Sequence, residues 1–174
     1  LILLGLLYTG SAMFLFWGYN FMGAGVATTI HFTYPIFVTL LMFVFFREKA
    51  SWITWLAILL AIAGVAKLSI KGSELTLDPL GMLIVILSAM AYASYIIVVN
   101  KSRVRSMNGR KLAFYVFIVS TLLFAVKAMS NEGIQPVPDA LSWINLFLLA
   151  VVPTVISNIT LVLAVHHIGG TLTS

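Results

Sequence analysis

The second long apolar stretch of the chain carries a group of residues that could bind a small polar molecule. Four of them recur at helical spacing and fall within about 80° of arc on one helix face: Thr28, His31, Pro35 and Thr39. Pro35 has no N–H, so the backbone carbonyl of His31 loses its intrahelical donor. Histidine changes charge near neutral pH. The imidazole of His31 and its own backbone carbonyl, which lacks a donor, lie at one level of the helix, and Tyr34 lies at the edge of the stripe. This face could line a polar cavity; alternatively, His31 bonds to a neighbouring helix and Pro35 only bends the span.

Two later apolar stretches show comparable groups. Ser88, Tyr92 and Tyr95 fall within about 60° of arc on one helix face. A tyrosine hydroxyl in mid-membrane needs a hydrogen-bond partner or a wet cavity, whereas Ala89 and Ala93 on the same helix suit close helix packing. Cavity lining and packing are therefore both open for this helix.

The last apolar stretch places Thr154, Ser157 and Asn158 on one side, next to the helix-bending Pro153. Asn158 is the most costly of the three polar residues to bury without a partner. The first apolar stretch repeats the pattern more weakly with Tyr8 and Ser11.

The sequence contains no residue set typical of catalysis or metal binding. Asp and Glu are missing from the apolar stretches, so a proton-linked process would use His31 or groups outside this chain, unless the process is independent of protons. His166 and His167 are adjacent and point about 100° apart, which is poor geometry for one metal ion and favours an interfacial location. Gly-rich phosphate loops and nucleophile motifs are also missing. We therefore expect no enzyme, no cofactor and no metal.

The composition identifies the elements that must position these residues. Hydrophobic residues make up 61% of the 174 and charged residues 9%, against about 25% charged in soluble domains. Residues 1–46 contain no charge and would measure roughly 69 Å as one helix, more than twice a ~30 Å hydrocarbon core, so they must fold back once. The unbroken apolar runs lack the ~10-residue alternation of transmembrane β-strands. The sequence thus predicts an all-α membrane protein with six spans, near 1–20, 24–46, 52–70, 80–100, 112–129 and 141–165.

The basic residues predict the orientation of these spans. Seven Lys and Arg residues lie in the connections after the second and fourth spans, and three lie on the opposite face, where four acids dilute them. Because basic loops stay in the cytoplasm, both ends of this chain are expected on the cytoplasmic side of the cell membrane. The stretch 101–111 is expected to touch anionic lipid and not nucleic acid.

A weak internal repeat relates the first and sixth spans. A shift of 146 positions aligns Leu3, Ser11, Leu15 and Gly23 with Leu149, Ser157, Leu161 and Gly169. The two spans run in opposite directions, so a repeat of five spans must be inverted, as in many transporters. Neither copy would then be complete, and we expect the chain to be a fragment.

Several motifs carry a resemblance to a known family. The stretch 24–35 (AGVATTIHFTYP), the triplet 47–49 (REK) and the stretch 56–65 (LAILLAIAGV) resemble the EamA repeat of the drug/metabolite transporter superfamily. A second copy is similar at 88–95 (SAMAYASY) and at the turn 169–170 (GG). The resemblance covers essentially the whole chain, and its strongest element is the succession of the AG, FTYP and REK motifs.

The resemblance implies a polytopic helical bundle of ten helices in two inverted five-helix repeats, of which about six are present here. On this basis residues 1–71 would be the last three helices of the first repeat. Residues 80–174 would be the first three helices of the second repeat and the start of the fourth. The family's helix that corresponds to residues 24–46 lines the substrate path, which favours the cavity interpretation of the His31 stripe.

The function that the resemblance implies is alternating-access transport of small polar metabolites, with efflux of amino acids or related compounds as the family-level expectation. Its partners would be the lipid bilayer and the metabolite. A nucleotide-sugar or lipid-linked sugar carrier is an alternative, although its anionic cargo would call for mid-span Lys or Arg, which this chain lacks. A non-transporting membrane assembly protein is a further alternative. The predicted substrate-binding residues are Thr28, His31, Tyr34, Pro35, Thr39, Ser88, Tyr92, Tyr95, Ser157 and Asn158.

Overall fold

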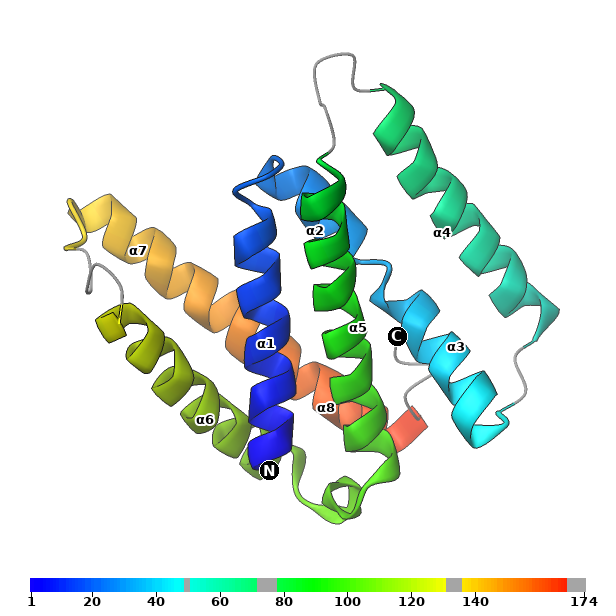
Figure 1. The fold of residues 1–174 in the computed structure, drawn as a ribbon. Coiled ribbons are helices and arrows are strands. Elements are labelled where there is room, and N and C mark those ends of the chain that lie inside the picture. The colour runs from blue at the N-terminus through cyan, green and yellow to red at the C-terminus, as the bar shows by residue number, and fades with distance from the viewer. Residues whose placement is uncertain (49–50, 72–77, 131–135, 169–174) are drawn as a thin grey trace. The chain divides into compact units, whose positions relative to one another are not determined.

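The fold is built from helices throughout the described residues, as the composition predicts. The computed structural model describes residues 1–48, 51–71, 78–130 and 136–168, and this part of the chain contains no β-strand. Figure 1 shows the helices, which are α1 (Ile2–Gly18), α2 (Ala24–His31), α3 (Tyr34–Phe46), α4 (Trp52–Lys71), α5 (Pro79–Lys101), the 3₁₀ turn η1 (Arg103–Ser106), α6 (Gly109–Ser130), α7 (Ala140–Leu149), the π-helical η2 (Ala150–Ile156) and α8 (Ser157–Ile168).

Four helical stretches of the described chain are long and apolar enough to cross a bilayer. They are Ala24–Phe46, Pro79–Lys101, Gly109–Ser130 and Ala140–Val165. Two shorter apolar helices, Ile2–Gly18 and Trp52–Gly64, occupy the places of the first and third predicted spans. The chain is therefore a multi-pass membrane protein of the all-α class, and large apolar side chains such as Phe45, Leu59 and Phe147 are exposed on its helices.

The predicted span 24–46 is confirmed as a candidate membrane span, but Phe32 and Thr33 interrupt its helix and separate α2 from α3. Pro35 offers no N–H to the carbonyl of His31, and its ring crowds that carbonyl, so regular α-helical pairing cannot continue. A tighter turn replaces it. The backbone N–H and Oγ1 of Thr33 both donate to the carbonyl of Ile30, at 3.0 and 2.7 Å. The N–H of Ile36 then donates to the carbonyl of Thr33 at 2.9 Å and opens α3.

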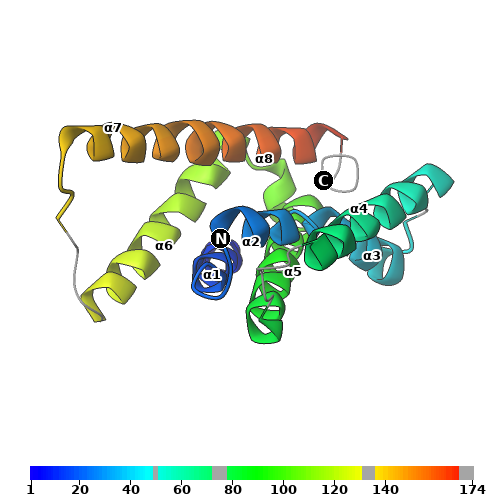
Figure 2. The same cartoon turned by 90° about the horizontal axis from the view of Figure 1, so that it is seen from above.

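Pro153 has a different effect in the last predicted span. Figure 2 shows α7 and α8 as one continuous run, with Pro153 inside the π-helical η2. The carbonyl four residues before Pro153 belongs to Leu149 and lacks its usual N–H donor. The hydroxyl of Thr154 donates to this carbonyl at 3.1 Å. A wider turn thus accommodates the proline, whereas Pro35 divides its helix.

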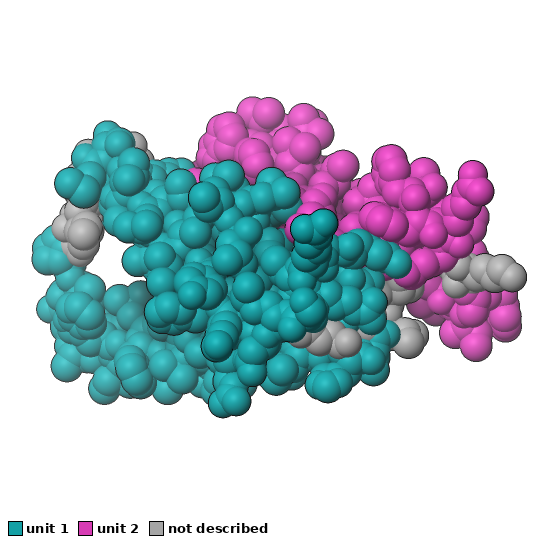
Figure 3. Space-filling model, turned by 90° about the horizontal axis from the view of Figure 1, so that it is seen from below, with its two compact units in different colours: residues 1–9, 99–173 teal, residues 10–98, 174 magenta. Residues whose placement is uncertain are grey.

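The helices form two compact units, coloured separately in Figure 3. Unit 1 comprises residues 1–9 and 99–173, and unit 2 comprises residues 10–98 and 174. The division falls inside α1 and α5, so it does not coincide with the predicted repeats 1–71 and 80–174, which stay a prediction.

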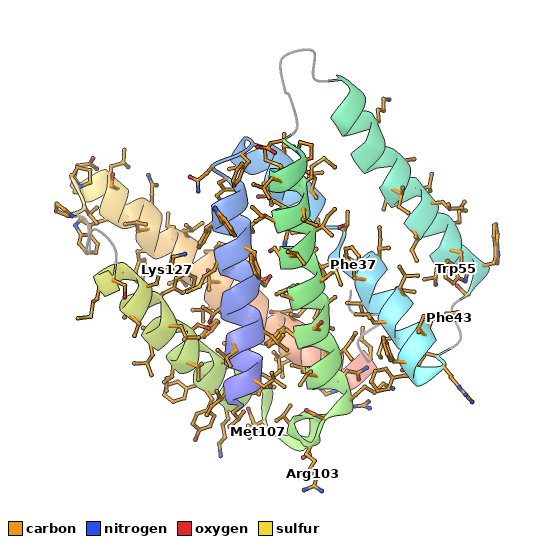
Figure 4. The ribbon with its side chains drawn as sticks, viewed as in Figure 1. Phe37, Phe43, Trp55, Arg103, Met107 and Lys127 are labelled. Carbon is orange, nitrogen blue, oxygen red and sulfur yellow. The ribbon has the colours of Figure 1, made fainter. Side chains whose placement is uncertain are left out.

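Unit 2 contains the core around which the predicted site is built. Met22, Ala27, Ile30 and Val85 are buried together. Gly18 of α1 lies against the side chain of Val85, where a Cβ atom would collide with it. Farther along the chain, Phe43 of α3 and Trp55 of α4 point toward each other, with ring centroids 5.7 Å apart in an edge-to-face arrangement (Figure 4). The first set of contacts joins α1, α2 and α5 in one core, and the second pairs α3 with α4.

Candidate functional site

The imidazole of His31 stands at the centre of a buried hydrogen-bond network in unit 2. His31 is the last residue of α2, and 8% of its surface is exposed. Its Nδ1 atom lies 2.9 Å from Oγ of Ser88 on α5. The same Oγ donates to the backbone carbonyl of Ser11 on α1 at 2.6 Å, and Oγ of Ser11 donates back to the carbonyl of Ser88 at 2.9 Å. Three helices therefore meet at this network.

Small residues allow α5 to approach its neighbours at this level. Ser88, Ala89 and Ala93 are fully buried. The packing interpretation of α5 thus holds for the alanines, while Ser88 on the same helix serves the polar network. The packing alternative is therefore confirmed for the alanines, whereas cavity lining by this helix stays a prediction.

Three tyrosine rings extend the network on one side. The ring centroids of Tyr34 and Tyr92 are 4.8 Å apart at an interplanar angle of 78°. The imidazole of His31 lies 6.0 Å from the ring of Tyr34 and 5.6 Å from that of Tyr92. Tyr95 stacks on Tyr92 at 5.8 Å and is almost completely buried, whereas Tyr34 and Tyr92 are half-buried. Residues from α2, α3 and α5 therefore form one aromatic and polar group.

The remaining residues of the predicted stripe are distributed differently. The Oγ1 atom of Thr28 lies 3.1 Å from the hydroxyl oxygen of Tyr19. The sequence analysis did not identify Tyr19 as a partner of Thr28. Thr39 is buried on α3, beyond the break, and Pro35 is half-buried at the start of that helix. Thr28 shares α2 with His31, as predicted, whereas Pro35 and Thr39 lie on α3, so the predicted stripe does not lie on one uninterrupted helix.

The two predicted site residues of the last span belong to unit 1. Nδ2 of Asn158 donates to the hydroxyl of Tyr8 at 2.9 Å and to the carbonyl of Thr154 at 3.0 Å. Its Oδ1 atom is buried and has no hydrogen-bond partner among the described residues. Ser157 is exposed. Within unit 1, Asn158 therefore connects α8 to the beginning of α1.

Two polar contacts of α1 lie outside the predicted set. Ser11 contacts Ser88, and Oγ1 of Thr9 donates to Oγ of Ser120 at 2.8 Å within unit 1. The signal that could have found them is the occurrence of adjacent polar residues in the middle of an apolar helix, because such residues need partners in hydrocarbon.

The electrostatic environment of the His31 group is set by its helices. Residues 1–46 and 79–100 contain no Lys, Arg, Asp or Glu. Among the described residues, no group of three or more His, Cys, Asp or Glu side chains could hold a metal ion. The arrangement offers hydrogen bonds and aromatic faces to a small molecule, without a fixed charge.

Comparison with known proteins gives the family. Residues 1–70 and 79–174 match the EamA-like transporter family. The chain belongs to this family. A relative of this EamA-like chain, the uncharacterized transporter sll1319 of Synechocystis sp. (strain ATCC 27184 / PCC 6803 / Kazusa), is 30% identical over 122 residues, or 67% of this chain and 37% of the relative. The uncharacterized transporter YdfC of Bacillus subtilis (strain 168) is 23% identical over 159 residues, or 87% of this chain and 49% of the relative.

The EamA-like chain thus matches half or less of the length of these curated relatives. No solved structure matches it significantly. The family membership agrees with the resemblance that the AG, FTYP and REK motifs carry, and with the helical architecture described above.

Proposed function

We propose that the protein transports small polar metabolites across the cell membrane by alternating access, and that the His31 group lines part of its path. The observation that carries this proposal is the 2.9 Å contact between His31 and Ser88 inside membrane-spanning helices, with Tyr34 and Tyr92 beside it. Family membership and the two relatives named as transporters support the activity.

The physical argument is the cost of polar groups in hydrocarbon. A histidine and several tyrosines within membrane helices are expensive to bury, and such residues commonly mark substrate or ion pathways. Part of the group also has a structural role, since Ser11 and Ser88 bond each other through side chain and backbone. The half-buried rings of Tyr34 and Tyr92 are the portion that we assign to the path.

The cargo and direction are inferred from the family alone, as efflux of amino acids or related compounds. The charge pattern gives the orientation: we infer that both ends of this chain lie in the cytoplasm, because the basic residues gather after the second and fourth predicted spans. An anionic cargo such as a nucleotide sugar is less compatible with the site, because residues 1–46 and 79–100 supply no Lys or Arg to meet it.

The test is efflux from cells that overexpress the full-length protein. Cells are challenged with toxic amounts of individual amino acids and their analogues, and export of each radiolabelled compound is then measured. We expect resistance and faster export for at least one of them. Unchanged resistance and export for the whole panel, with the protein present in the membrane, would contradict the proposal.

The role of His31 is tested with three variants. His31→Ala and His31→Gln should lower the initial export rate at equal membrane levels. The glutamine keeps a side chain that can bond Ser88 and controls for folding. Leu59→Ala is the control, because this residue of α4 is 64% exposed and the substitution should leave export unchanged. Full export by both His31 variants would remove His31 from the path.

A further inference from the structure

The hydrogen-bond network around Ser88 fixes the position of its single hydroxyl proton. The Oγ of Ser88 lies 2.6 Å from the carbonyl oxygen of Ser11. A carbonyl oxygen has no proton, so Ser88 must be the donor at this short distance. The hydroxyl proton of Ser11 is directed in turn to the carbonyl of Ser88 at 2.9 Å. Neither serine proton is left for the imidazole.

The contact between Ser88 and His31 then has only one consistent direction. The hydroxyl of Ser88 donates its proton to the carbonyl of Ser11. Toward Nδ1 of His31, 2.9 Å away, the Oγ of Ser88 can therefore only accept a hydrogen bond. Nδ1 of His31 must therefore carry a proton. In the neutral imidazole the other ring nitrogen, Nε2, is then a hydrogen-bond acceptor.

The Nε2 atom of His31 has no hydrogen-bond partner among the residues that the structure describes. The side chain as a whole is more than nine-tenths buried. The Nε2 atom itself is not among the buried side-chain atoms that lack a partner, so it keeps accessible surface. A ligand that brings a donor to Nε2 therefore forms a hydrogen bond that the described residues do not provide.

The surroundings of His31 select among possible donors. The rings of Tyr34 and Tyr92 lie 6.0 and 5.6 Å from the imidazole, and the faces of tyrosine rings attract cations. Residues 1–46 and 79–100 contain no Lys or Arg to repel a positive charge. A donor that is also a cation therefore fits best.

We propose that Ser88 holds His31 in the form protonated at Nδ1, and that Nε2 accepts a hydrogen bond from the ammonium group of a small amine held beside Tyr34 and Tyr92. Ser88 is a positioning residue in this arrangement, because it acts on the ligand through the imidazole. The identification of the amine as cargo rests on the proposed transport function, whereas the protonation of Nδ1 does not.

The first measurement is ¹⁵N NMR of the full-length protein, labelled on histidine and reconstituted in lipid nanodiscs, at a pH where the imidazole is neutral. The His31→Gln spectrum identifies the His31 signals. We expect Nδ1 to be protonated and Nε2 to be unprotonated. An imidazole protonated at Nε2 and unprotonated at Nδ1 would overturn the proposal. This measurement does not depend on the folding of a Ser88 variant.

Variants then test the positioning role. Ser88→Ala removes the acceptor for Nδ1, so the His31 signals should shift toward the form protonated at Nε2. Ser11→Ala keeps the backbone carbonyl that receives the Ser88 proton, so the protonation of His31 should stay unchanged. Ser94→Ala is the matched control on α5, since the hydroxyl of Ser94 donates to the carbonyl of Met90 in its own helix. Unchanged His31 signals in Ser88→Ala would contradict the proposal.

Three probes of one shape test the ligand class: benzylamine, benzyltrimethylammonium and benzoate. Benzylamine should shift the Nε2 signal in a saturable way. Benzyltrimethylammonium has no N–H and should bind about tenfold more weakly, the difference expected for one hydrogen bond to a charged group. Benzoate should leave the signal unchanged. Equal binding of the two cations, or a shift with benzoate, would overturn the ammonium assignment.

The two proposals fail separately in these experiments. NMR of the purified protein does not depend on transport. If no export is found, a protonated Nδ1 and a response to benzylamine are therefore still expected. If the protein exports metabolites but the imidazole of His31 is protonated at Nε2, the transport function stands. The role proposed for Ser88 is then wrong.

Discussion

Asn158 donates a hydrogen bond of 2.9 Å to the hydroxyl oxygen of Tyr8, which lies 150 residues earlier in the chain. Within unit 1 this contact joins the first turns of α1 to the first turn of α8. It gives a partner to the buried amide side chain of the last predicted span. Hydrocarbon offers no water to replace such a partner, so the contact should contribute to stability.

Tyr8→Phe tests the contribution of this bond. The substitution removes the acceptor for Nδ2 of Asn158 and keeps the ring that packs on Phe117 at 5.9 Å. We expect the free energy of unfolding to fall by about 1 kcal/mol, the scale of hydrogen bonds between membrane helices. Denaturant unfolding in detergent micelles measures the change. Tyr115→Phe is the control, because Tyr115 is 45% exposed. Equal stability of the two variants would contradict the prediction.

The bond between Thr9 and Ser120 is suited to a double-mutant cycle. Both side chains are buried, and the distance between the hydroxyl oxygens is 2.8 Å. Thr9→Val and Ser120→Ala should each destabilise unit 1, and the double variant should lose less than the sum of the two. We expect a coupling free energy of about 1 kcal/mol in the same unfolding assay. A coupling of zero would show that the bond does not form in the membrane.

Two glycines of α1 should respond in opposite ways to alanine. A Cβ atom at Gly5 would collide with the side chain of Val119 on α6, whereas a Cβ atom at Gly10 would meet no atom within 4 Å. Gly5→Ala should lower the free energy of unfolding by about 1–3 kcal/mol, the usual cost of overpacking. Gly10→Ala should leave it unchanged or raise it by up to about 1 kcal/mol, because alanine restricts the unfolded chain.

A compensating substitution makes the Gly5 prediction specific. Val119→Ala removes the two methyl groups that the new Cβ atom would meet but keeps the Cβ atom of residue 119, so it relieves part of the collision. Gly5→Ala should therefore lower the free energy of unfolding by less in the Val119→Ala background than in the original protein. An equal or larger loss in that background would show that the collision is not the cause.

The orientation can be tested with single cysteines, since this chain contains none. Pro79 and Ser106 flank α5, whose 23 residues span about 34 Å, enough to cross the hydrocarbon core. In spheroplasts that express the full-length protein on a cysteine-free background, an impermeant maleimide should label Pro79→Cys. It should label Ser106→Cys only after the membrane is permeabilised. The reverse pattern would show that the basic turn η1, with its exposed Arg103 (Figure 4), faces outward.

The fold class and the location of the helices could be predicted from the sequence. Long runs without charge, such as residues 1–46, have no stable place in water, and only a helix satisfies the backbone of such a run within itself. The consequences of the prolines were harder to predict. Pro35 divides a helix, while Thr154 supplies a hydroxyl to the carbonyl that Pro153 leaves without a donor. The local sequence predicts that a backbone hydrogen bond is lost at each proline. It does not predict which group replaces the missing donor.

The candidate site shows the same limit. The types and periodicity of residues identified His31, Ser88 and Tyr92 as polar groups that need partners in hydrocarbon. Tertiary structure alone decided that Ser88 serves both His31 and Ser11, and that Thr28 turns to Tyr19. The reason is physical: the cost of burying a polar atom belongs to one residue and can be read from its position in the sequence. The hydrogen bond that offsets this cost requires a second atom within about 3 Å, and only the packing of separate helices brings it there.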